Sequence, residues 1–151
     1  MANKKLLWWA YIVELIAAGL TLFALCLWLG STSVTTFIRD VAIDTATLFG
    51  AVMLAASLGF LWTFYSKSDT EFYRWLDSQG ALSIYLSATV YSVLVSLLST
   101  LSLVALKHVT NNGFALLASY LLILAIINLV TLVNNVVGLM KLNAKYNHKM
   151  Y

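Results

Sequence analysis

Apolar and polar residues alternate along the chain in long blocks. Four apolar stretches, at about residues 6–29, 41–65, 81–106 and 114–140, each supply the roughly 20 residues that cross a bilayer as a helix. Polar breaks at 30–40, 66–80 and 107–113 separate them, and no soluble domain is left over. The pattern predicts an all-α integral membrane protein, a four-transmembrane-helix bundle that forms one domain over residues 1–151.

Two local patterns refine this picture. Continuous apolar runs such as Leu121–Ile127 lack the alternation that a transmembrane β-strand requires, which favours helices. The break at Thr110–Gly113 has turn chemistry and predicts a tight hairpin between the third and fourth spans.

The composition excludes several classes of protein. The 151 residues are 62% hydrophobic and only 10% charged, whereas soluble domains are roughly 45–50% apolar and about 25% charged. The apolar content excludes disorder, and the single cysteine, Cys26, excludes a disulfide scaffold. With two distant histidines and one thiol, we expect no metal centre and no cofactor.

The distribution of Lys and Arg predicts the orientation. Seven of the nine basic residues lie on the side that holds both termini and the second break, including a short basic tail over 141–151. The positive-inside rule therefore places both termini in the cytoplasm, and the small size and basic bias favour a bacterial inner (cytoplasmic) membrane. Glu14 within the first apolar run favours an uncleaved first span over a signal peptide.

The second break carries its own helix signal. Ser68 and Glu71 fit a capping box, and an aromatic segment follows before Gly80. We predict a short interfacial helix between the second and third spans, with a cytoplasmic extension of the third span as the alternative. Either form offers residues for docking a protein partner: Phe72, Tyr73, Arg74 and Trp75.

Small residues form a stripe on the second span. Interfaces between membrane helices are rich in small and polar residues, because lipid does not drive helices together by the hydrophobic effect. The stripe repeats every fourth residue: Thr47, Ala51, Ala55, Gly59 and Thr63. It predicts either a seam between copies of the chain or, with somewhat more weight, packing inside one bundle.

A second stripe, of hydroxyl side chains, follows one face of the third span. Its members are Thr89, Ser92, Ser96 and Ser99. Such a face lines a wet pore when several copies surround an axis, but more often its hydroxyls bond to carbonyls of their own helix or to a neighbouring helix.

Glu14 is the candidate proton or cation site. It lies about 12 Å along the first helix, where a charge costs about 2.5–3.5 kcal/mol and needs a compensating role. Counted from the cytoplasmic end of the fourth span, Thr131 and Asn135 lie at a similar depth, on a polar face that also carries Asn128. We expect Glu14 to be protonated or hydrogen-bonded to this face, either as a working site or as a link between helices.

Other charged residues have simpler interpretations. Asp40 and Asp44 are predicted to cap the start of the second span, where a helix N-terminus favours negative charge. No nucleophile, base and acid converge, so we expect no enzymatic activity, and nothing indicates binding of nucleic acid.

Four short helices with one glutamate in the first resemble the small multidrug resistance transporters. The resemblance rests on Glu14 and on the number of spans, and it implies Glu14 as a shared proton and substrate site in a dimer. The chain departs from that family in its lack of proline, its long charged second loop and its asparagines in the fourth span.

Two functions follow from these observations. The first is a non-enzymatic tetraspan protein that forms a homo-oligomer and acts as a pore-forming, sensor or anchoring subunit for a cytoplasmic or membrane partner. The alternative is a small proton-coupled cation transporter or proton channel that uses Glu14.

Overall fold

A computed structural model describes residues 4–150 of the chain and the side chains of residues 8–148. Over these residues the fold is all-helical, as predicted, and four helical segments are long and apolar enough to cross a membrane. The elements are α1 (Lys4–Leu29), α2 (Ser31–Thr45), a π-helical turn η1 (Ala46–Gly50), α3 (Ala51–Lys67), α4 (Glu71–Ser78), α5 (Leu82–Ala105) and α6 (Asn112–Met150).

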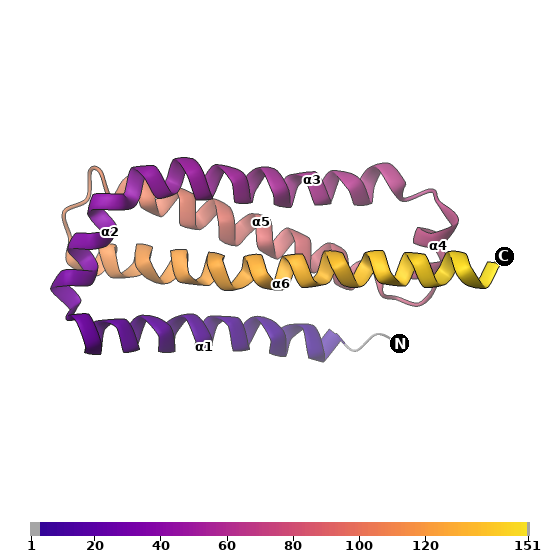
Figure 1. Ribbon diagram of the computed structural model, residues 1–151, viewed down its shortest axis with the longest axis horizontal. Coiled ribbons are helices and arrows are strands. Elements are labelled where there is room, and N and C mark those ends of the chain that lie inside the picture. The colour runs from indigo at the N-terminus through magenta and orange to yellow at the C-terminus, as the bar shows by residue number, and fades with distance from the viewer. Residues whose placement is uncertain (1–3, 151) are drawn as a thin grey trace.

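The long helices pack side by side in the order α3, α5, α6 and α1, and they do not form a closed ring. α5 packs against both α3 and α6, and α6 packs against α1, whereas α3 and α6 make little backbone contact with each other (Figure 1). α2 crosses one end of the bundle and α4 lies at the other, where α1 begins and α6 ends (Figure 1). We call these the α2 end and the α4 end.

The polar break predicted over residues 30–40 is not a loop, because α2 is helical from Ser31. Only Gly30, with φ of +84°, separates α1 from α2, in a conformation that glycine adopts without strain. The α2 sequence is polar, but its buried side chains Val34, Ile38 and Ala42 recur every fourth residue and pack on the bundle. Tertiary burial of this one face sustains the helix.

The predicted caps at Asp40 and Asp44 are also wrong. Both residues lie well inside a helix that begins at Ser31, and both are exposed. The neighbouring Arg39 instead donates hydrogen bonds to the carbonyl oxygens of Val109 (2.8 Å) and Thr110 (2.6 Å). Arg39 thereby fixes the connection between α5 and α6 to the side of α2.

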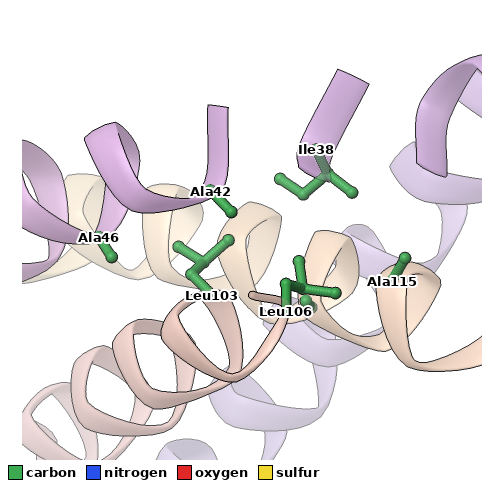
Figure 2. Close-up of a cluster of buried hydrophobic side chains, with 7 residues drawn as sticks. Ile38, Ala42, Ala46, Leu103, Leu106 and Ala115 are labelled. Atoms are coloured by element: carbon green, nitrogen blue, oxygen red, sulfur yellow. The ribbon is translucent and has the colours of Figure 1, made fainter. Parts of the chain in front are cut away.

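The core at the α2 end is apolar and closely packed. Figure 2 shows Ile38, Ala42 and Ala46 facing Leu103 and Leu106 of the α5 end, with Ala115 of α6 beside them. The alanines let the helix backbones approach closely, which is how membrane helices gain packing energy.

α4 is a separate short helix, not an extension of α5, because a turn at Gly80 (φ +68°) divides the two. The predicted capping box does not form: the Ser68 hydroxyl donates to the carbonyl of Tyr65, at 2.9 Å, and Thr70 precedes the helix. The basic tail is helical, since α6 continues through it to Met150. Within it, Tyr146 packs against α4.

Candidate functional site

Glu14 is buried in the middle of the bundle. Its side chain is only 6% exposed, although most of its neighbours on α1 are exposed. The α1 face that carries Glu14 and Ala18 packs against α6. The Asn128 amide Nδ2–H of α6 donates a hydrogen bond to Glu14 Oε2, at 3.2 Å. The structure thus brings Glu14 together with the polar face of the fourth span.

The other two members of that face contribute differently. Asn135 and Thr131 both border a cavity beside Glu14. The Thr131 hydroxyl donates to the carbonyl of Ile127, at 3.4 Å. Asn128 itself is 2% exposed, and its carbonyl oxygen Oδ1 is buried without a hydrogen-bond partner. A buried amide oxygen without a partner costs free energy, so it is open to a donor that enters the cavity.

Two tyrosines complete the surroundings of Glu14. Tyr11 of α1 and Tyr91 of α5 stack with ring centroids 4.2 Å apart and ring planes 28° apart. Both hydroxyl groups are buried and have no hydrogen-bond partner. The sequence interpretation missed these tyrosines. The i to i+3 spacing of Tyr11 and Glu14 on one helix face is the signal that would have indicated the first of them.

These side chains border a cavity of about 340 Å³ between α1, α5 and α6, which we call the Glu14 cavity. Its polar lining consists of Tyr11, Glu14, Tyr85, Tyr91, Ser92, Asn128, Thr131 and Asn135. Among the described residues, Glu14 supplies the only ionisable carboxyl of this lining. One carboxylate surrounded by amides, hydroxyls and aromatic rings suits a proton or a single monovalent cation.

No group of three His, Cys, Asp or Glu side chains comes together in the part of the chain that the structure describes. A transition metal needs several such ligands, and the Glu14 cavity offers one carboxylate.

The hydroxyl stripe of the third span lies inside the chain. Thr89, Ser92 and Ser96 are 4% exposed or less, and each donates to the carbonyl four residues earlier in α5. Ser99 is equally buried, at 3%. Ser92 reaches the lining of the Glu14 cavity, and the stripe as a whole faces the neighbouring helices of one chain.

The small-residue stripe of the second span faces outward instead. Thr47, Ala51, Ala55 and Gly59 are exposed, and Thr63 is half-buried. The opposite face of the same helix is buried against α5, through residues such as Gly50, Met53 and Ser57. Packing inside one chain therefore uses the other face of this helix.

The four predicted docking residues of α4 divide into two kinds. Phe72 and Tyr73 are buried at 6% and 7% exposure, and they pack against Phe64, Leu139 and Tyr146. Arg74 is exposed and Trp75 half-buried. Burial raises the pKa of the Tyr73 hydroxyl above its ordinary value, because the anion would lose its hydration. The aromatic side of α4 thus contacts its own bundle.

Comparisons of this chain with protein-family models, with curated proteins and with solved structures find no match.

Proposed function

We propose that this protein is a small membrane protein that binds a monovalent cation at Glu14 in exchange for a proton. The observation that carries the proposal is the burial of Glu14 among Asn128, Tyr11 and Tyr91, beside a cavity with no second ionisable carboxyl in the described part of the chain.

A buried charge costs free energy unless it is neutralised. A carboxylate in the middle of a bilayer is neutralised either by a proton or by a cation that enters the cavity, so the two compete for one group. Asn128 holds the carboxyl in place through α6, and the stacked side chains of Tyr11 and Tyr91 line the cavity beside it. Competition at one carboxylate is the basis of exchange.

The proposed setting is the inner membrane of a bacterium. The excess of Lys and Arg at the α4 end supports a cytoplasmic location for both termini, and the aromatic residues of α4 suit the membrane interface. A protease-sensitive tag after Tyr151 is expected to be cleaved only from the cytoplasmic side.

The test measures binding of tetraphenylphosphonium to the protein in phosphatidylcholine nanodiscs, between pH 5 and pH 8. We expect saturable binding that weakens as the pH falls, because protons then occupy Glu14. Glu14→Gln is expected to abolish the binding, and Glu71→Gln, at the exposed glutamate of α4, to leave it unchanged.

Flux into liposomes completes the test. Proton efflux driven by a tetraphenylphosphonium gradient is expected from the wild type and not from Glu14→Gln. Binding or flux that persists in Glu14→Gln would contradict the proposal and would favour a path along the hydroxyl side chains of α5.

Self-association is a second candidate property, favoured by the outward face of α3. Small residues on an exposed face let a second helix approach closely. In a Cys26→Ser background, Ala55→Cys is expected to form a cross-linked dimer in membranes, and Val130→Cys, on the exposed side of α6, is not. Equal cross-linking of both variants would argue against a seam on α3.

A further inference from the structure

A second cavity adjoins the Glu14 cavity. It has a volume of about 230 Å³, and Tyr85 and Asn135 line both cavities. We call it the Lys67 cavity, because Lys67 at the last position of α3 borders it. It has no part in the proposed exchange at Glu14.

The Lys67 cavity results from the packing order of the helices. α5 packs against both α3 and α6, which leaves a gap between those two helices. α4 folds across the α4 end of this gap and inserts two buried aromatic side chains, Phe72 and Tyr73. The gap is therefore bounded by protein on four sides: α3, α4, α5 and α6.

The lining is apolar through most of its extent. Phe60 and Phe64 of α3 face Val136 and Leu139 of α6 across it. The two threonine hydroxyls of the lining are already satisfied, because Thr63 donates to the carbonyl of Gly59 and Thr89 to that of Tyr85. The walls therefore suit a hydrocarbon chain, because they are mostly apolar and their threonine hydroxyls already have hydrogen-bond partners.

Charge is confined to one end of the Lys67 cavity. Within the described residues, Lys67 is the only charged side chain of the lining. Asn143 of α6, which is exposed, adds an amide to the lining. A positive charge at the end of an apolar cavity complements a molecule with an apolar chain and an anionic head.

We infer that the Lys67 cavity binds a linear amphiphile with one anionic head group, its chain between α3 and α6 and its carboxylate or phosphate at Lys67. The head group has two sources, a free fatty acid or an anionic membrane lipid. Both present the same chemistry to Lys67.

The experiment uses radiolabelled decanoate with the full-length protein in phosphatidylcholine nanodiscs, after subtraction of binding to empty nanodiscs. Decyl phosphate and lysophosphatidylglycerol serve as anionic competitors. Decanol and decyltrimethylammonium carry a similar chain with a neutral and a cationic head. Saturable decanoate binding is expected, displaced by the anionic competitors and not by the other two. Unlabelled decanoate and lysophosphatidylglycerol distinguish the two sources: stronger displacement by decanoate indicates a free fatty acid, and stronger displacement by lysophosphatidylglycerol indicates an anionic membrane lipid.

Matched variants test the location. Val136→Phe fills the cavity and is expected to abolish binding, whereas Val133→Phe, on an exposed face of the same helix, leaves it unchanged. Lys67→Gln is expected to weaken binding about fivefold, the range of a single partly exposed ion pair. Lys107→Gln, an exposed lysine near the α2 end, is the control for charge.

The two proposals fail in different ways. Glu14→Gln is expected to keep decanoate binding within twofold of the wild type. Decanoate binding at Lys67 is thus independent of cation binding at Glu14. Decanoate binding that survives Val136→Phe, or that decanol displaces as well as decyl phosphate does, would overturn it. Unchanged binding in the exposed-site variant Lys67→Gln would overturn it as well.

Discussion

The α2 end and the middle of the bundle are built from different residues and pack differently. At the α2 end, alanines pack with Leu103, Leu106 and Ile38, and neither the Glu14 cavity nor the Lys67 cavity reaches this buried cluster. In the middle and toward the α4 end, tyrosines and asparagines replace these residues and line the two cavities, and several buried polar atoms have no partner. Small residues pack helices closely, whereas large polar side chains hold them apart. The α2 end is therefore built for rigidity, whereas the middle of the bundle leaves space for a ligand.

The largest expected effect is at the α2 end. Leu103→Ala removes a side chain with no exposure from the close-packed cluster and is expected to cost about 3 kcal/mol of unfolding free energy, because the rigid surroundings cannot fill the space. The measurement is unfolding by dodecyl sulfate in mixed micelles. Leu101→Ala, an exposed residue of the same helix, is the control. Equal losses in both variants would remove the distinction between the two regions.

A somewhat smaller loss is expected from Gly50→Ala in the π-helical turn. A Cβ at position 50 would overlap the Thr100 hydroxyl and lie 3.1 Å from Thr100 Cβ. Thr100 is held by its own bond to the carbonyl of Ser96, at 2.7 Å, so α3 and α5 must separate. We expect a cost of about 2 kcal/mol. Gly59→Ala, where the new methyl group meets nothing within 4 Å, should have no such cost in the same unfolding assay.

A still smaller loss is expected in the middle of the bundle from Asn128→Ala. This change removes the one hydrogen bond from α6 to Glu14 and is expected to cost about 1 kcal/mol, within the range for bonds between membrane helices. Asn134→Ala, at an exposed neighbouring position, is the matched control in the same assay. A loss above that of Leu103→Ala would show that polar contacts, not close packing, dominate the stability.

The smallest effect is expected from Tyr91→Phe. Its hydroxyl has no hydrogen-bond partner, so its removal should change the unfolding free energy by less than about 0.5 kcal/mol. Tyr120→Phe is the contrasting variant, because the Tyr120 hydroxyl donates to the carbonyl of Leu15 at 3.2 Å and its loss should destabilise the contact between α1 and α6. A larger loss in Tyr91→Phe than in Tyr120→Phe would mean that Tyr91 has a partner in solution.

The sequence predicted the four long helices and the approach of Glu14 to the polar face of the fourth span, because hydropathy and helix depth follow directly from residue order. Depth matched Glu14 to Thr131 and Asn135, whereas the hydrogen bond comes from Asn128 on the same face. The sequence did not predict α2. Averaged hydropathy treats Ser31–Thr36 as a polar break, while the burial of Val34, Ile38 and Ala42 depends on the other helices. The capping box at Ser68 does not form for a local reason, since the Ser68 hydroxyl donates to the carbonyl of Tyr65 at the end of α3.

The residues around Glu14 also differ in how well the sequence could predict them. Asn128 was accessible to prediction because an amide is costly in hydrocarbon and must face protein. Tyr91 was not, because a tyrosine is ordinary in a membrane helix and its stacking on Tyr11 depends on how α1 and α5 converge.

Tyr85 and Asn135 form a wall that two cavities share. A substitution at either position reshapes both cavities in one mutational step, whereas changes at Val136 or Ala10 alter one cavity only. If both cavities have a function, a substitution at Tyr85 or Asn135 affects two functions, whereas a substitution at any other lining residue affects one. Among related chains, Tyr85 and Asn135 should then diverge more slowly than the side chains around them, and adaptation to a new ligand should proceed through the unshared walls.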